Sequence, residues 1–215
     1  MRVEIWSDVA CPWCYVGTAR FERAVDASGI DAEVVYRSFQ LDPTIAMGGD
    51  GPNAVRYLAK KLGGPEQVAA IHARLEAAAE GLDIEFRWSQ MRRANTFDAH
   101  RLLGWVLHSA GARTQRALKK ALLRAYFTES LDITDHDVLA GLAANAGLDR
   151  GSAAALLDSD AEADHVRAER EEAYRKGITA VPTFVVEGRW KVQGAIETDE
   201  WVAALRQMSA ELDAS

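Results

Sequence analysis

The sequence is poor in three features that mark common classes of protein. It has only two cysteines among 215 residues, no excess of positive charge, and no apolar run long enough to cross a bilayer. Its net charge of -7 argues against nucleic-acid binding, which needs clustered Lys and Arg to neutralise phosphates. A membrane-spanning helix needs about 20 consecutive apolar residues. We therefore expect neither a nucleic-acid partner nor a membrane span.

The N-terminus lacks the pattern of a secretory signal peptide. Glu4 and Asp8 interrupt the stretch in which the apolar region of such a signal would fall. If Met1 is the native start, a cytoplasmic protein is expected. A permanent structural disulfide is not expected in that reducing compartment, so the two cysteines are predicted to be reactive or metal-binding.

Both cysteines lie in the stretch Cys11-Pro12-Trp13-Cys14, where a β-like run gives way to a helical pattern. The first N–H groups of a helix have no partner within it, and the peptide dipoles add partial positive charge there. Both effects stabilise a thiolate, the nucleophilic form of cysteine. Cys11 is therefore the predicted nucleophile. Cys14 lies one turn later on the same face, which makes it the predicted resolving thiol.

This spacing predicts thiol–disulfide exchange through a mixed disulfide on Cys11 that Cys14 releases. Pro12 suits the first helical turn, because its missing N–H would have no partner there in any case. Trp13 carries no charge that could hold a thiolate, unlike a histidine at that position. We therefore predict a redox potential less oxidising than the extreme of about -120 mV known for this chemistry.

A zinc site and an inert buried pair are the alternatives for the cysteines. Structural zinc needs four ligands, and the chain has no second pair of cysteines. Two core cysteines seldom fall at a helix start with proline between them. The histidines are scattered along the sequence without metal-ligand spacing, at His72, His100, His108, His136 and His165. No metal is therefore expected.

Hydrophobic periodicity predicts a β–α–β unit first, with strands over 2–7 and 32–39 and a helix over 12–27, so that the strands should be parallel. A loop over 41–53 follows. Helices are then expected over 54–62, 65–81, 95–109 and 114–128, and over a segment that Thr134 and Asp137 cap and Gly147 closes, with 82–88 extended and Gly111 as a hinge.

The C-terminal part predicts a charged helix over 160–176, a β-hairpin over 183–193 and a last helix from Thr198. Without the helical block, this order of elements is that of thioredoxin. The predicted fold class is therefore α/β, a thioredoxin fold with a large all-helical insertion domain. The predicted domains are a thioredoxin-like domain, 1–45 and 155–215, and an insertion domain, 46–154.

Several motifs together resemble the DsbA family of thioredoxin-fold disulfide oxidoreductases, and within it the cytosolic FrnE-like branch. They are "SDVACPWCYVG" at 7–17 and "GITAVPTFVVEGRWKVQGA" at 177–195, supported by "ANTFDAH" at 94–100 and "AYFTESLDITD" at 125–135. The resemblance spans essentially the whole chain. It implies that Cys11 and Cys14 form the redox pair.

The resemblance further implies that Pro182 is a cis proline whose loop, with Val181, faces the cysteines. The backbone of Val181 would then pair with an extended substrate segment. The expected substrate-binding residues are Pro12, Trp13, Val181 and Pro182. Protein or small-molecule thiols and disulfides are the expected partners.

Three polar residues are expected to support the site. Asn95 and His100 match the family's motif in the helical block and would lie at the domain interface, although helix capping and packing would explain them equally well. Asp8 either orders the loop before Cys11 or takes part in proton transfer to Cys14. An Asp after a strand is usually a turn residue, which favours the first role.

The chain lacks the further cysteine pair that some FrnE-like proteins carry. Turnover would therefore use glutathione, another thiol protein or the substrate directly, with no bound cofactor. Two rival functions stay open. One is a glutathione-dependent isomerase or transferase similar to 2-hydroxychromene-2-carboxylate isomerase or the kappa class. The other is a non-catalytic, chaperone-like thiol-binding module, to whose groove Trp13, Tyr15 and Phe184 would contribute. Some relatives form homodimers, so a homodimer is a candidate assembly.

Overall fold

The computed structural model describes residues 1–49 and 54–214, and its centre is a four-stranded sheet of order β2–β1–β3–β4. β1 runs parallel to β2 and antiparallel to β3, which pairs with β4 in the predicted hairpin. The strands are β1 (Arg2–Ser7), β2 (Glu33–Ser38), β3 (Thr183–Val186) and β4 (Trp190–Gln193). The thioredoxin-like order of elements is thus confirmed.

One face of the sheet is covered by α1 (Pro12–Ser28) and α8 (Thr198–Asp213). Three fully buried aromatic residues, Phe21, Phe184 and Trp201, meet between these helices and β3. Their ring centroids lie 4.7–5.1 Å apart, at angles typical of favourable aromatic packing. This cluster fixes α1 on the sheet and so fixes the position of its N-terminus.

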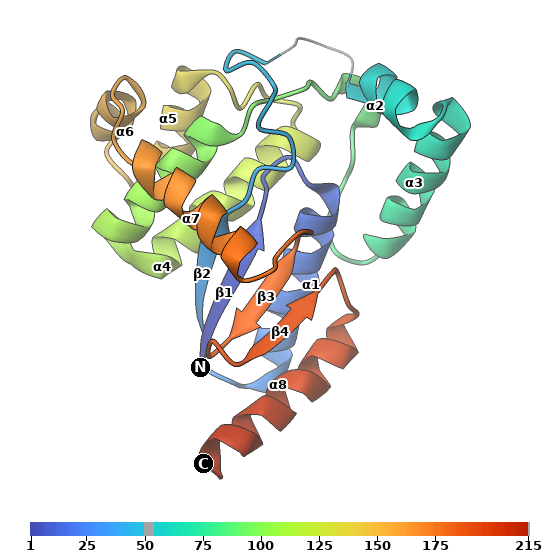
Figure 1. Ribbon diagram of the computed structural model, residues 1–215, viewed down its shortest axis with the longest axis vertical. Coiled ribbons are helices and arrows are strands. Elements are labelled where there is room, and N and C mark those ends of the chain that lie inside the picture. Colours follow the sequence, from blue (N-terminus) through green and yellow to red (C-terminus); the bar gives the residue numbers. More distant parts are fainter. Residues whose placement is uncertain (50–53, 215) are drawn as a thin grey trace.

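The opposite face packs against α7 (Ala163–Arg175) and α4 (Phe97–Phe127). Figure 1 shows α7 crossing in front of the sheet, with α4 beside β2. Gln115 of α4 is buried and bonds both backbone groups of Tyr36, accepting from its N–H at 2.8 Å and donating to its carbonyl at 2.9 Å. The outer edge of β2 is therefore closed by α4.

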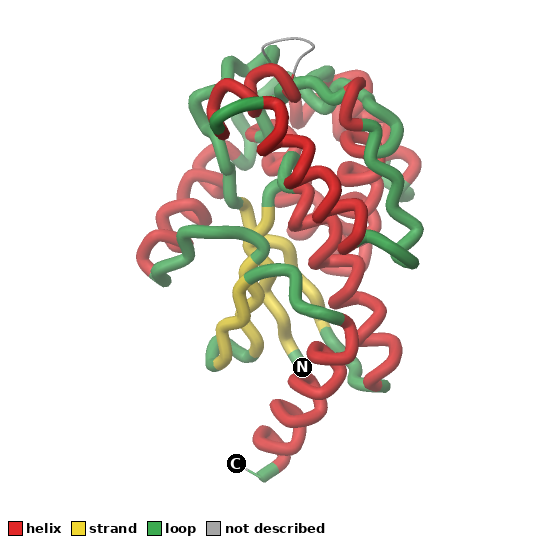
Figure 2. The backbone as a smooth tube through the Cα atoms, turned by 90° about the vertical axis from the view of Figure 1, so that its right-hand side faces the viewer, coloured by secondary structure: helices red, strands yellow, loops and turns green. Residues whose placement is uncertain are grey.

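A block of helices lies over the end of the sheet at which β1 leads into α1, while both termini lie towards the other end (Figures 1 and 2). It has its own apolar core, which includes Leu102, Leu118, Leu122, Phe127 and Leu139. No helix among the described residues is both long enough and apolar enough for a bilayer. The block contains α2 (Ala54–Leu62), α3 (Pro65–Ala78), a short 3-10 helix (Trp88–Gln90), α4, α5 (His136–Asn145) and α6 (Arg150–Leu157).

The hinge predicted at Gly111 is present as a kink that divides α4 into two arms. Gly111 has φ 81°, a left-handed conformation that glycine adopts without strain. The first arm carries His100 and the second carries Lys119. The kink lets residues from both arms turn towards the sheet.

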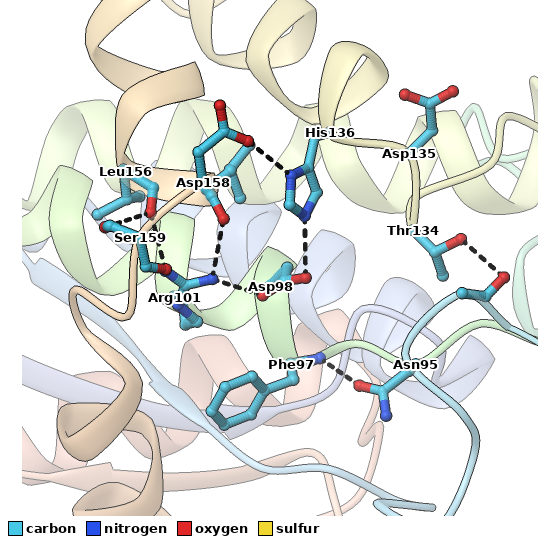
Figure 3. A network of polar contacts seen from close by, with 12 residues as sticks. Asn95, Phe97, Asp98, Arg101, Thr134, Asp135, His136, Leu156, Asp158 and Ser159 are labelled. Atoms are coloured by element: carbon cyan, nitrogen blue, oxygen red, sulfur yellow. Dashed lines mark hydrogen bonds and ion pairs between the residues drawn. The ribbon is translucent and has the colours of Figure 1, made fainter.

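Buried charge holds the block together, as Figure 3 shows. The guanidinium of Arg101 on α4 donates to the carbonyls of Leu156 and Ser159 after α6, and to the carboxylate of Asp98. Asp98 also contacts His136 at the start of α5, at 3.2 Å. Helices α4, α5 and α6 are therefore joined through one charged network.

Three local predictions in this block are wrong or incomplete. Residues 82–88 form no strand, because the chain turns at Asp83 (φ 58°) and continues irregularly to the 3-10 helix. Asp135, not Thr134, caps α5, and its carboxylate accepts from two backbone N–H groups at the helix start. Helix α6 was not predicted, since its sequence "RGSAAALL" has little periodicity. The predicted loop at 41–53 lies partly outside the described residues.

Candidate active site

The thiol predicted to attack lies at the predicted helix start. Cys11 is the N-cap of α1, with an extended backbone (φ -96°, ψ 112°), and Pro12 occupies the first helical turn. The backbone N–H of Cys14 donates to Sγ of Cys11 at 3.3 Å. An anion on this sulfur is stabilised by that N–H and by the helix dipole.

The second thiol lies one turn into the helix and is fully buried. Burial, together with the adjacent Cys11 sulfur, raises the pKa of the Cys14 thiol well above its ordinary value. Cys14 is therefore held as a neutral thiol while Cys11 is reduced. It must lose its proton before it can attack.

The loop before β3 closes over the cysteines. The Val181–Pro182 peptide bond is cis, and the Cys11 thiol donates to the carbonyl of Val181 at 3.7 Å. Gly17 of α1 permits this approach, because a Cβ there would lie 2.8 Å from Cγ of Pro182. The sequence motif does not single out Gly17, although it belongs to the stretch "CPWCYVG".

Asp8 is buried beneath the loop that precedes Cys11. Its carboxylate accepts from the N–H of Leu41 at 2.8 Å and of Ala10 at 3.3 Å, and contacts Nε2 of His100 at 3.4 Å. Burial raises the pKa of Asp8, but the contacts with His100 and Leu41 outweigh it, so the net pKa lies below the ordinary value. Asp8 is thus held as a carboxylate.

A buried lysine that the motifs do not include faces the same place. Lys119 is 1% exposed, and its Nζ has no hydrogen-bond partner. Burial lowers its pKa to about 8, while the negative charges of Cys14, Asp8 and Cys11 oppose that fall. Its Nζ lies over the ring of Tyr36, 5.6 Å from the ring centroid. A buried ammonium without a hydrogen bond is costly, so such a group is a candidate for a functional role.

One sequence signal could have revealed Lys119. It falls on the same helical stripe as Leu122, Leu123 and Tyr126, all buried, whereas the adjacent Lys120 is exposed. A charged residue at a core position of an amphipathic helix is the informative departure from the pattern.

The two other supporting residues have different partners. His100 contacts Asp8, as described. The amide oxygen of Asn95 instead accepts from the N–H of Phe97 at the start of α4 (Figure 3). It also accepts from Gln40, and the amide nitrogen of Asn95 donates to the carbonyl of Ile45. Asn95 therefore caps a helix and holds a loop, and it contacts neither cysteine.

A cavity of about 330 Å³ opens beside the N-terminus of α1. Pro12 and Trp13 line one side of it, and residues of α2 and α3 line the other. The cationic side chains of Lys61 and Arg93 lie in its wall. Phe184, expected near a groove, lies in the sheet core instead. The other lining residues include Asp8, Leu41, Tyr57, Leu62, Ile71, Leu75, Trp88 and Met91.

The fold and the cysteine pair together define a thioredoxin-fold protein of the disulfide-exchange type. Residues 2–206 match the family model described as a DSBA-like thioredoxin domain, and the chain belongs to this family. It is 40% identical to a probable DsbA oxidoreductase from Streptomyces coelicolor, with a TM-score of 0.88 and coverage of 98% of this chain and 91% of that one. The uncharacterized protein YwbO of Bacillus subtilis is 28% identical, over 95% of this chain and 96% of the relative.

More distant structures share the fold. The cytosolic disulfide reductase DsbM from Pseudomonas aeruginosa, solved with GSH, has a TM-score of 0.65 at 18% identity and covers 98% of this chain and 100% of its own. A 2-hydroxychromene-2-carboxylate isomerase has a TM-score of 0.69 at 16% identity, with both chains fully covered. The FrnE-like branch and the domain boundaries at 45 and 155 stay predictions.

Proposed function

We propose that the protein is a thiol–disulfide oxidoreductase in which Cys11 attacks and Cys14 resolves. The observation that carries this proposal is the hydrogen bond from the Cys14 N–H to Sγ of Cys11 at the start of α1. The Cys11 thiolate attacks a substrate disulfide, forms a mixed disulfide and expels one thiolate. The Cys14 thiolate then attacks Sγ of Cys11, forms the Cys11–Cys14 disulfide and expels the second thiolate. Two electrons and two protons pass to the substrate.

The resolving step needs a charge that favours the buried Cys14 thiolate. In the proposed mechanism the ammonium of Lys119 provides it, since its charge lowers the pKa of the Cys14 thiol against the effect of burial. The carboxylate of Asp8 in turn keeps Lys119 protonated, and His100 holds Asp8. Asp8, Lys119 and His100 change the electrostatic surroundings of the two sulfurs and do not react themselves. They are therefore positioning residues.

Glutathione is the small thiol that we propose as a redox partner, in the cytoplasm. The cavity beside Trp13 supports this, because it offers apolar walls together with the cation of Lys61, whose charge is opposite to that of the carboxylates of glutathione. Leu41 and Leu62 of the same cavity are 49% and 41% exposed, so apolar parts of a protein substrate could also enter. In either case Val181 and Pro182 would contact the bound segment. A homodimer stays a prediction that sedimentation can test.

An isomerase of the glutathione-dependent type is the second candidate, which the presence of a cavity beside Trp13 favours. Such an enzyme has no need of Cys14, whereas Lys119 and Asp8 are arranged around that thiol. A non-catalytic module would need neither the charges nor a buried second thiol. The environment of Cys14 therefore favours the oxidoreductase.

The deciding experiment is insulin reduction with glutathione as reductant, using the wild type, Cys11→Ser and Cys14→Ser. We expect both variants to lose turnover, and Cys14→Ser to accumulate a mixed disulfide on Cys11 that mass spectrometry detects. Activity retained by both variants would refute the proposal. Tight binding of glutathione, with turnover of an isomerisation substrate that survives Cys14→Ser, would favour the second candidate.

A further inference from the structure

Two histidines that lie far apart in the sequence meet between α4 and α7. His108 is on the first arm of α4, and His165 is in the first turn of α7, three residues after Glu162 at the N-cap. Each of the three side chains offers one ligand atom, and these atoms all lie within 4.8 Å of one another. Two imidazoles and one carboxylate form a common ligand set for zinc. The sequence spacing gives no sign of this meeting.

One oxygen in this group lacks a partner. Oε2 of Glu162 is buried and makes no hydrogen bond. Nε2 of His165 is also buried and is paired with the carboxylate of Glu169 at 3.3 Å, which is itself bonded by Arg37 at 2.9 Å and by the N–H of Ser38 at 2.7 Å. A buried polar atom without a partner is rare, so Oε2 of Glu162 requires an explanation.

Gly104 of α4 lies directly against the group. A Cβ on Gly104 would lie 3.0 Å from Oε2 of Glu162 and 3.6 Å from Nε2 of His165, so both atoms approach the same bare stretch of α4. Glu162 has φ 63°, a left-handed conformation that is unfavourable for a residue with a side chain. The fold therefore holds the Glu162 carboxylate in place at an energetic cost.

His136 shows what an ordinary histidine ion pair looks like in the same molecule. Its Nε2 contacts Asp98 at 3.2 Å and its Nδ1 contacts Asp158 at 3.5 Å, from opposite edges of the ring (Figure 3). Those carboxylates cannot converge on one ion. By contrast, Nδ1 of His108 lies 3.0 Å from Oε1 of Glu162. The other oxygen of that carboxylate, Oε2, and the imidazole of His165 both lie against Gly104. Within residues 1–49 and 54–214, this is the one group of three such side chains with converging ligand atoms.

We propose that His108, Glu162 and His165 bind one divalent transition-metal ion of the zinc type, which ties α4 to α7. Imidazole nitrogens and a carboxylate suit Zn²⁺, and three protein ligands leave a fourth position for water. The competing arrangement is an ion pair. In that arrangement a protonated imidazole of His165 would pair with Glu169, which lies 3.3 Å from its Nε2.

The test is titration of the chelator-treated full chain with Zn²⁺ at pH 8, followed by calorimetry. Cys11→Ser and Cys14→Ser are both introduced beforehand, so that thiolates supply no ligands. We expect one ion per chain and a higher unfolding temperature with Zn²⁺ than without it. His108→Ala and His165→Ala should each weaken binding by at least about tenfold, and Glu162→Gln should weaken it as well. His136→Ala is the matched control and should leave binding unchanged.

A second readout guards against variants that bind poorly because they are misfolded. Co²⁺ should give visible absorption bands in the control variant, and His165→Ala should lose them while its circular dichroism stays native. The proposal is overturned if Zn²⁺ does not bind saturably, or if binding is the same in the His108, His165 and His136 variants. Either result would leave only an ion-pair cluster.

Discussion

The N-terminus of α1 and the inner face of α4 prepare the two sulfurs in different ways. At α1 the sulfur of Cys11 is supported by a backbone N–H and the helix dipole, and no buried ion is needed. At α4 the protein buries the ammonium of Lys119, about a hundred positions later in the chain, where its charge acts on the Cys14 thiol. In the proposed mechanism the attacking thiol is thus prepared by its neighbours in sequence, and the resolving thiol by a distant helix.

The two arrangements also differ in what they cost the stability of the fold. A helix N-terminus exists in any helix, so its use for Cys11 costs the fold almost nothing. A lysine without a hydrogen-bond partner in the interior destabilises the native state. In the proposed mechanism the helical block is therefore more than a cover for the substrate, since it carries the charge that favours the Cys14 thiolate.

Lys119→Met is the change with the largest expected effect on this comparison. The fall of the Lys119 pKa from its ordinary 10.5 to about 8 corresponds to about 3 kcal/mol of native-state destabilisation, since one pKa unit is about 1.4 kcal/mol. The variant should gain up to about that much free energy of unfolding and should resolve mixed disulfides about tenfold more slowly. Urea unfolding and rapid-quench trapping of the mixed disulfide measure the two effects.

The neighbouring lysine provides a control for that prediction. Lys120 is 56% exposed and forms an ion pair with Glu22, so Lys120→Met should change stability by no more than about 1 kcal/mol and leave the resolution rate as it is. A wild type whose stability does not rise between pH 8 and pH 10 relative to Lys119→Met would count against a buried, charged Lys119. In that window the unfolded lysine binds its proton while the folded one has lost it, so the contribution of Lys119 to stability increases with pH. The comparison with the variant is needed because Cys14, whose pKa is raised, acts in the opposite direction above about pH 9.

Asp8→Asn should have the next largest effect. Without the carboxylate, the pKa of Lys119 falls below about 8, so that the charge beside Cys14 is lost at a lower pH than in the wild type. We expect the alkaline limb of the activity–pH profile to move to lower pH, with a severalfold loss of rate at pH 8. The same carboxylate, with a pKa below its ordinary value, stabilises the fold above about pH 4, and this contribution disappears as the pH falls through the folded-state pKa.

A profile for Asp8→Asn that keeps its shape, with only a uniform loss of rate, would mean that Asp8 merely orders the loop at Leu41. His100→Asn tests whether the shift of the alkaline limb comes from the Asp8 carboxylate itself. It removes the imidazole that contacts Asp8 but leaves the carboxylate in place, so its alkaline limb should move less than that of Asp8→Asn.

The contrast between contacts local in sequence and contacts with a distant helix also separates the features that the sequence predicts from those that it does not. The β–α–β unit, the hairpin, the kink at Gly111 and the helix start at Cys11 all follow from local patterns, and the structure confirms them. Local patterns suffice there because turn chemistry, periodicity and the lack of N–H partners act within a few residues.

Contacts between distant parts of the chain are what the patterns miss. Nothing in the order of residues places Lys119 beside Cys14, or His108 beside His165, because both meetings depend on how α4 bends and packs. Asn95 is a case that the sequence left open between a place near the active site and helix capping. Its amide bonds the N–H of Phe97 at the helix start and the carbonyl of Ile45, as the second alternative expects.

Gly17→Ala has the smallest expected effect and tests the contact between α1 and the proline loop. The new Cβ would lie 2.8 Å from Cγ of Pro182 and 3.2 Å from Cβ of Ala195, so the loop must move away from the cysteines. We expect a loss of about 1–3 kcal/mol in stability and a modest fall in kcat/KM for protein substrates. Gly141→Ala in α5 is the control, because a Cβ there meets nothing within 4 Å and should stabilise the helix by up to about 1 kcal/mol. If both substitutions stabilise the protein alike and leave kcat/KM unchanged, the loop is not held by this contact, and substrate recognition depends on the cavity beside Trp13 instead.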